Sequence, residues 1–196
     1  MSVTRDYPVN QGPSRGERAL FGTVYFAFKP ELAVANQAVS LGNHLSARHG
    51  LSGAVSPEVL HVTLCPLGFF PMLSDERIET ACRIAGALVE KPFELCFDRV
   101  RSYPNGQENM PFVAYGGTAH YRLELFRRAL SADLRRAGFP IKKYLPDPHM
   151  TLFYERIRVA EEPIEPIHWT VRDFTLIHSI HGQTRHVMLG QWPLRG

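Results

Sequence analysis

The feature that most constrains how this chain folds is an internal repeat in which a strand and then a helix precede a His-x-Thr-Leu segment. The segment occurs as HVTL at 61–64 and as HMTL at 149–152. The interval from Phe26 to His61 is 35 residues and that from Val113 to His149 is 36 residues. Because the two copies keep nearly the same internal spacing, the sequence predicts two similar structural units.

Hydrophobic periodicity and turn residues indicate the elements of each copy. In the first copy we expect strands at 21–28, 60–68 and 93–103. A helix with the apolar stripe Val34, Ala38, Leu41 and Leu45 should follow the first strand, and a helix capped by Ser74 should follow the second. Pro104-Asn105-Gly106 should form a turn after the third strand. In the second we expect a strand at 110–117, a helix at 119–137, a strand at 148–154 and a closing hairpin of strands at 169–180 and 185–192. This order predicts an α+β protein with two similar lobes.

The chain is long enough for one bilobal domain, expected over residues 19–196 with pseudo-repeats at about 19–103 and 108–194. Residues 1–18 are polar and rich in Pro, Gly and Arg, so we expect a mobile tail there. With no apolar N-terminal stretch, we expect a cytoplasmic protein without membrane association, and we expect a monomer. Three cysteines imply no disulfide framework.

A net charge of +3 suits an anionic ligand but is too small for a protein that coats nucleic acid. Because side chains alternate across a strand, His61 and Thr63 should project to one face, as should His149 and Thr151. If a pseudo-twofold axis relates the two copies, all four side chains face one groove. Two imidazoles could then transfer protons while two hydroxyls bind phosphate oxygens, which is phosphodiester chemistry that needs no metal and no cofactor.

Chance placement of nine His and nine Thr would give roughly 0.4 His-x-Thr pairs and about 0.04 His-x-Thr-Leu segments. A single histidine on a strand is more often a hydrogen-bonded structural residue than a catalytic one. Two copies, each preceded by the same strand and helix, therefore indicate a shared site.

Other residues give weaker signals. Lys142 and Lys143 lie in the loop before the second motif, where they could contact backbone phosphate or form a solvated surface pair. Phe153 is a candidate for stacking on a terminal base, because simple alternation puts it on the face of His149 and Thr151. The cluster of His178, His181, Arg185 and His186 matches no zinc-binding pattern, so we expect no metal site there, although His178 could edge the groove.

The motifs EVLHVTLCPLG and PDPHMTLFYER, the Leu-rich helix that ends in AGF, and the closing pair VRDFTLIHS and HVMLGQWPL carry a family resemblance. Over about 19–194 the chain resembles the two-histidine (2H) phosphoesterase superfamily, and within it the bacterial RNA 2′,3′-cyclic phosphodiesterases, also called 2′-5′ RNA ligases. The resemblance implies antiparallel-sheet lobes with outer helices around a central groove. Where many relatives carry basic residues after the motifs, this chain has Cys65 and Phe153.

The same resemblance implies that the enzyme opens 2′,3′-cyclic phosphate ends of RNA to a 2′-phosphate without a metal, with reverse 2′-5′ ligation as a related activity. In that family the first motif's histidine donates a proton and the second accepts one, which here would be His61 and His149. Two alternatives remain open at this stage. The groove could act on a small cyclic-phosphate nucleotide, such as one derived from ADP-ribose, or it could bind RNA or nucleotides without turnover.

Overall fold

The computed structural model describes residues 21–51, 53–103, 108–116 and 121–196. The expected tail at 1–18 and the expected turn at 104–106 lie outside these residues. The strands are β1 (Gly22–Phe28), β2 (Val62–Phe70), β3 (Phe93–Ser102), β4 (Met110–Tyr115), β5 (Met150–Glu155), β6 (Glu162–Val171), β7 (Asp173–Ile180) and β8 (Arg185–Pro193). The helices are α1 (Leu32–Arg48), α2 (Asp75–Ala87) and α3 (Tyr121–Arg136), with a 3-10 turn, η2, at Pro57–Val59.

The strands form one antiparallel sheet in the order β6-β3-β4-β5-β2-β1-β7-β8. This order divides into a first lobe (β2, β1, β7, β8) and a second lobe (β5, β4, β3, β6). The lobes join where Val62 on β2 pairs with Met150 on β5. The predicted two-lobed α+β fold is therefore confirmed, and the two motif strands lie side by side at its centre.

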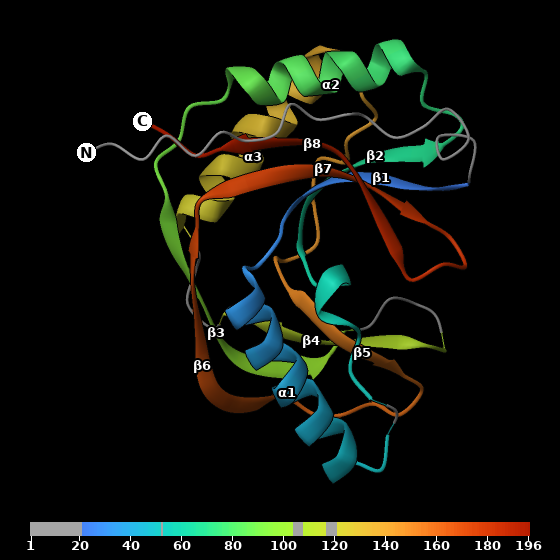
Figure 1. Cartoon of the computed structure of the whole chain (residues 1–196), viewed down its shortest axis with the longest axis vertical. Helices are drawn as coiled ribbons and strands as arrows, with labels where there is room; N and C mark the ends of the chain where they lie inside the picture. Colours follow the sequence, from blue (N-terminus) through green and yellow to red (C-terminus); the bar gives the residue numbers. More distant parts are fainter. Residues whose placement is uncertain (1–20, 52, 104–107, 117–120) are drawn as a thin grey trace.

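Each helix that precedes a motif strand packs on the lobe opposite to that strand. Helix α1 follows β1 of the first lobe but contacts β5 and β6, whereas α3 follows β4 of the second lobe and contacts β2. Helix α2 contacts α3 and β8. Figure 1 shows this exchange, with α2 and α3 beside the first lobe and α1 beside the second. The crossed helices hold the two lobes together on both sides of the narrow β2–β5 contact.

The helix boundaries follow from local sequence. Ser74 caps α2, since its side chain accepts a hydrogen bond from the Arg77 amide. Gly50 and Gly138 have φ values of 66° and 81° just beyond α1 and α3, where the left-handed region favours glycine. Leu123, Phe126, Leu130 and Leu134, which recur at helical spacing and form the apolar stripe of α3, are buried. Most of the stripe expected for α1 is buried as well. Among the described residues, no helix is long and apolar enough to cross a membrane.

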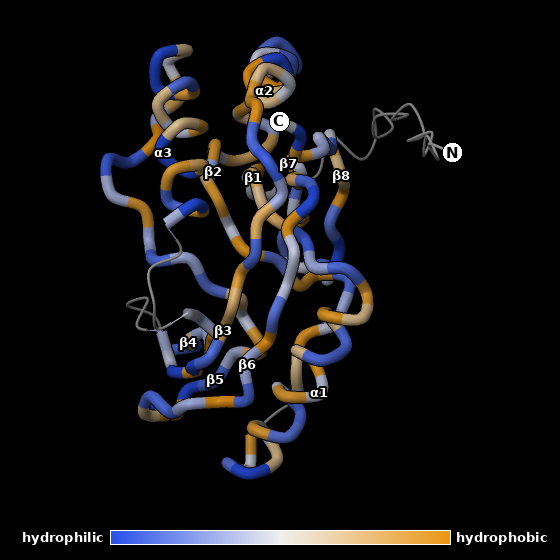
Figure 2. Tube along the Cα trace, turned by 90° about the vertical axis from the view of Figure 1, so that its left-hand side faces the viewer, coloured by the Kyte–Doolittle hydropathy of each residue, from blue (hydrophilic) through white to orange (hydrophobic). Residues whose placement is uncertain are grey.

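Both motif strands contain an irregularity at the leucine that follows the threonine. In the β1–β2 pairing, Thr63 and Cys65 oppose consecutive residues of β1, so Leu64 is an extra residue. In the β4–β5 pairing, Thr151 and Phe153 oppose consecutive residues of β4, so Leu152 is extra. Such a bulge turns the following side chain to the other face of the sheet. All four residues at Leu64-Cys65 and Leu152-Phe153 are accordingly buried. Figure 2 shows the hydrophobic residues along β2.

Candidate active site

The β2–β5 contact brings the two motifs together. Val62 of the first motif pairs with Met150 of the second motif in antiparallel register. Val62 and Met150 are fully buried on the core side, so strand alternation directs the four motif side chains to the opposite face. The two motifs therefore present their histidines and threonines on the same side of the β2–β5 contact.

A cavity of about 360 Å³ opens on this face. It is lined by His61, Thr63 and Thr151 of the motifs and by Thr23, Tyr25, Val55, Val59, Pro66, Tyr154, Ser179 and His186. His149 is outside this lining, but it lies near enough for its charge to lower the pKa of His61. The structure thus brings three of the four predicted residues into one cavity and sets the fourth beside it.

The two histidines make the same contact with their own backbone. The Nδ1 of His61 lies 2.7 Å from the carbonyl oxygen of Val59, and the Nδ1 of His149 lies 2.7 Å from that of Asp147. A carbonyl oxygen only accepts hydrogen bonds, so Nδ1 carries the hydrogen and donates in both rings. Nε2 is then the atom of each ring that is left to accept or donate a proton.

A tyrosine ring stacks on each imidazole. The ring centroids of Tyr25 and His61 are 5.0 Å apart with planes inclined at 26°, and those of Tyr103 and His149 are 4.8 Å apart at 25°. The Nδ1 bond and the stacked ring together restrict rotation of each imidazole. Restricted rotation keeps Nε2 aimed in one direction, as proton transfer requires.

Burial makes both histidines weak bases when the cavity is empty. Loss of hydration lowers the pKa of His61 to about 4, aided by the charges of Lys29 and His149 and opposed by the bond to Val59. Loss of hydration also lowers the pKa of His149, and the positive charges of Arg127 and Arg101 act in the same direction. Both imidazoles are therefore neutral at pH 7 before substrate binds.

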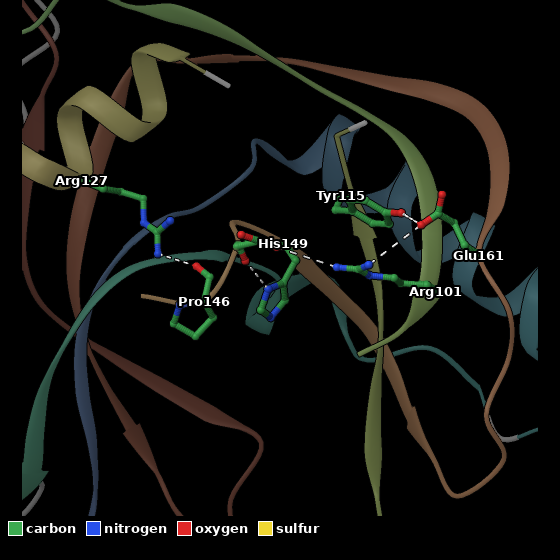
Figure 3. Close-up of polar contacts among 7 residues, drawn as sticks. Arg101, Tyr115, Arg127, Pro146, His149 and Glu161 are labelled. Atoms are coloured by element: carbon green, nitrogen blue, oxygen red, sulfur yellow. Dashed lines mark hydrogen bonds and ion pairs between the residues drawn. The ribbon is translucent and has the colours of Figure 1, made fainter. Parts of the chain in front are cut away.

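The buried side chain of Arg127 ties the two motifs together from behind. Its Nε–H donates to the Leu64 carbonyl at 3.2 Å, and its Nη2–H donates to the Pro146 carbonyl at 2.7 Å. Glu124 accepts a third bond from Nη1 at 2.7 Å. One guanidinium of α3 thus holds the first motif strand and the segment that leads into the second, as Figure 3 shows on the Pro146 side.

A second cationic group lies on the other side of His149 (Figure 3). The Arg101 guanidinium is 3.9 Å from the Asp147 carboxylate and 4.0 Å from that of Glu161, and it lies over the Tyr115 ring at 4.6 Å. The Tyr115 hydroxyl donates to Glu161. His149 is consequently flanked by two arginines, an environment that favours an anionic ligand.

His186 and Tyr25 belong to the site although the sequence analysis did not select them for it. The ring of His186 is 5.2 Å from that of His61, and its Nε2 is 3.2 Å from the Tyr25 hydroxyl. Burial lowers the pKa of His186 to about 3, with further lowering by His61 and Lys29. Both residues reach His61 because β1 and β8 join the lobe of β2. No signal in the sequence order predicts that arrangement.

The weaker candidates fall in different places. Lys142 and Lys143 are exposed in the loop before β5, where Lys143 lines a separate cleft. The prediction that Phe153 stacks on a base is wrong, because the bulge at Leu152 turns Phe153 into the core, where it stacks on Phe112 with centroids 4.6 Å apart. His178 does not edge the cavity, since it is only 1% exposed and packs against Phe70.

The sequence analysis expected no metal site. In the part of the chain that the structure describes, no group of three or more His, Cys, Asp or Glu side chains is arranged to hold a metal ion. His181, the third histidine of the predicted hairpin, is instead hydrogen-bonded through Nε2 to the Thr23 hydroxyl at 2.8 Å.

Solved structures share this fold. E. coli LigT in complex with 3′-AMP superposes with a TM-score of 0.72 at 22% identity, covering 90% of this chain and 99% of LigT. LigT in complex with NADP⁺ gives 0.71 at 21% identity over 90% and 99%. TT0787 of Thermus thermophilus gives 0.70 at 23% identity over 89% and 98%. At these identities the similarity concerns the fold alone.

A search of curated proteins found no match to the chain. The model of the 2′-5′ RNA ligase superfamily matches residues 29–183, which include both His-x-Thr motifs and most of the chain. The match agrees with the resemblance in the motifs and with the shared fold. The chain therefore belongs to the 2′-5′ RNA ligase superfamily, whose members are two-histidine phosphoesterases.

Proposed function

We propose that the protein is a phosphodiesterase that opens the terminal 2′,3′-cyclic phosphate of RNA to a 2′-phosphate, with His61 and His149 as its acid and base. The observation that carries the proposal is the matched pair of imidazoles, each with Nδ1 bonded to the backbone and Nε2 free to exchange a proton, at the β2–β5 contact. Family membership and the shared fold of LigT support the same chemistry.

In the reaction, neutral His149 accepts a proton at Nε2 from a water molecule as the water oxygen attacks phosphorus. The bond from phosphorus to the ribose 3′ oxygen breaks, and protonated His61 donates its Nε2 proton to that oxygen. The products are a 3′ hydroxyl and a 2′-phosphate, and the two histidines have exchanged protonation states. Attack by a 5′ hydroxyl in place of water, with the same bond to the 3′ oxygen broken, would form a 2′-5′ linkage. The donor and acceptor roles follow those of the family that the motifs resemble.

The low pKa of His61 fits the donor role once the substrate is present. A phosphate anion within a few ångströms stabilises the imidazolium and raises its pKa, so His61 gains its proton together with the substrate. An imidazolium that burial has made acidic then transfers the proton readily. The hydroxyls of Thr63 and Thr151 donate to the non-bridging oxygens, where negative charge increases in the transition state.

A small cyclic-phosphate nucleotide is the second candidate substrate. Solved LigT structures with 3′-AMP, ATP and NADP⁺ show that a protein of this fold takes up small nucleotides. The cavity of about 360 Å³ is of a size that accepts one nucleotide unit. The catalytic steps would be the same, because both substrates present a strained cyclic diester to the two imidazoles.

The test is a comparison of three substrates in the presence of excess chelator: a short RNA with a 2′,3′-cyclic phosphate end, a 2′,3′-cyclic mononucleotide, and a cyclic phosphate derived from ADP-ribose. The proposal predicts ring opening of the RNA end with the highest kcat/KM. Faster turnover of a small nucleotide would support the second candidate. Tight binding of all three without turnover would identify a binding module instead.

A further inference from the structure

A second cleft lies between α3 and the loop that leads into the second motif. Its volume is about 310 Å³, and it is lined by Glu124, Arg127, Arg128, Ser131, Arg135, Lys143, Tyr144 and Leu145. Four of these side chains are cations and one is a carboxylate. The cleft is therefore strongly positive, although the whole chain has a formal charge of only +3.

The charged side chains of this cleft differ in whether they already have partners within the protein. Glu124 is engaged by the buried Arg127, so its charge is already compensated. Arg135 donates to the carbonyls of Ile141 and Lys142, which shapes the loop. Arg128 and Lys143 are exposed, and neither forms an ion pair with another residue that the structure describes. These two cations are available to an anionic ligand.

The cleft is lined in part by the loop that leads into the second motif. Helix α1 ends at Arg48 and α3 ends at Arg136, each thirteen residues before the histidine of the following motif. The loop between α1 and His61 and the loop between α3 and His149 are therefore equivalent under the pseudo-twofold axis. Val55, six residues before His61, lines the catalytic cavity, and Lys143, six residues before His149, lines the cleft. Arg127 also lines the cleft while it holds Leu64 and Pro146. Besides burial, the charge of Arg127 lowers the pKa of His149, so the cleft lies next to the second motif.

We propose that this cleft binds an internal backbone phosphate of an RNA strand whose 3′-terminal cyclic phosphate occupies the catalytic cavity. The inference rests on the proposed function and adds that the substrate is a polynucleotide. Arg128 would hold the phosphate through its planar guanidinium and Lys143 through its ammonium. Tyr144, which is 79% exposed with Lys143 5.4 Å from its ring centroid, offers a face for an adjacent base.

The two classes of substrate differ in how they would use the cleft. A cyclic mononucleotide has a single phosphate, which the catalytic imidazoles engage, so nothing remains for Arg128 and Lys143. An oligonucleotide places its next phosphates outside the catalytic cavity. Removal of the cleft cations should therefore weaken only the longer substrate, and most of the effect should be on KM, because the cleft does not contact the reacting atoms.

The experiment measures kcat and KM of the wild-type protein and of Arg128→Gln, Lys143→Gln and the double variant with a cyclic-phosphate oligonucleotide and with a cyclic mononucleotide. For the oligonucleotide we expect KM to rise about tenfold in the double variant and the salt dependence to weaken by roughly 0.7 in log–log slope for each lost phosphate contact. Mononucleotide kinetics should stay unchanged. Arg136→Gln, on the same helix but outside the cleft, is the matched control.

Equal effects on both substrates, or no effect on either, would overturn the cleft proposal while leaving the catalytic proposal intact. If the wild-type protein turns over neither substrate, the proposed function fails, and the cleft is then tested by binding alone. Fluorescence anisotropy with a labelled oligonucleotide ending in a 3′-phosphate should show weaker binding by the double variant than by Arg136→Gln. Equal affinity of these two variants would overturn the cleft proposal in that case as well.

Discussion

Val62 and Met150 face each other across the centre of the sheet, and this one pair sets the relation between the two motifs. Both side chains are fully buried in the core. The motif histidines and threonines on either side of the pair are therefore directed away from the core. A pseudo-twofold axis through this pair brings both copies of the sequence repeat to one face of the sheet.

Replacement of either catalytic histidine should abolish most activity without unfolding the protein. His61→Ala and His149→Ala should each lower kcat by about 10² to 10⁴, the range for loss of one positioned proton-transfer group. The double variant should lose much less than the product of the two single losses, because the two groups act as a unit. Steady-state kinetics with circular dichroism as a folding control provides the measurement. Near-normal rates in folded single variants would place the site elsewhere.

The two threonines should contribute through their hydroxyls. Thr63→Ala and Thr151→Ala should each lower kcat by about 10-fold to 10³-fold, since each removes a hydrogen bond that strengthens as charge develops on phosphate. Thr63→Ser and Thr151→Ser keep the hydroxyl and serve as matched controls that should retain most of the activity. If the serine and alanine variants behave alike, the methyl group and not the hydroxyl is what matters at these positions.

The pH dependence of kcat/KM should be bell-shaped with an acidic optimum. His149 must be neutral to accept a proton, so activity falls below its pKa, which burial lowers from 6.5. His61 must be protonated to donate, so activity falls above its pKa, about 4 in the empty cavity. Since kcat/KM reports the free enzyme, in which both pKa values are lowered from 6.5, its optimum should lie below pH 6.5. The optimum of kcat should lie higher, because bound phosphate raises the pKa of both histidines. A kcat/KM that still rises above pH 8 would contradict these assignments.

Arg127 should matter both for stability and for the protonation of His149. Arg127→Met removes three hydrogen bonds from a buried site and should lower the free energy of unfolding by about 2 to 4 kcal/mol. Loss of the charge should also raise the pKa of His149 and move the acid limb of the kcat/KM profile to higher pH. Arg127→Lys should restore the acid limb but only part of the stability. If the acid limb of the kcat/KM profile is unchanged in Arg127→Met, the role of Arg127 is structural only.

The sequence predicted the parts of this fold that depend on local pattern. The strands other than β6, the buried stripe of α3 and the two His-x-Thr motifs follow from periodicity and from the spacing of the repeat. The single strand expected at 169–180 was wrong, because the chain there forms the end of β6 and, after Arg172, the separate strand β7. The prediction from strand alternation that Phe153 shares the face of His149 and Thr151 was wrong. The bulge that turns Phe153 depends on how β4 and β5 pair, and the pattern of residues does not indicate it. His186 and Tyr25 were missed for a related reason, since they reach His61 only through the order of strands in the sheet.

Local sequence patterns also could not predict that α1 packs on the second lobe and α3 on the first. The apolar stripe of α1 predicts a buried face but not which sheet covers it, and in the structure that sheet is made mainly of strands that come later in the chain. The hydrogen bonds from Arg127 to both motif segments depend on the same exchange. Arg127 reaches Leu64 because α3, a helix of the second half of the chain, packs on the first lobe.

The central claim is that the two imidazoles open a 2′,3′-cyclic phosphate at its 3′ oxygen. Phosphorus-31 NMR of a cyclic-phosphate oligonucleotide incubated with the wild-type protein and excess chelator tests it most directly, with the His61→Ala/His149→Ala double variant as control. The account predicts that the wild-type protein converts the cyclic resonance into that of a 2′-phosphate and that the double variant leaves it unchanged. A 3′-phosphate product, or equal conversion by the double variant, would contradict it.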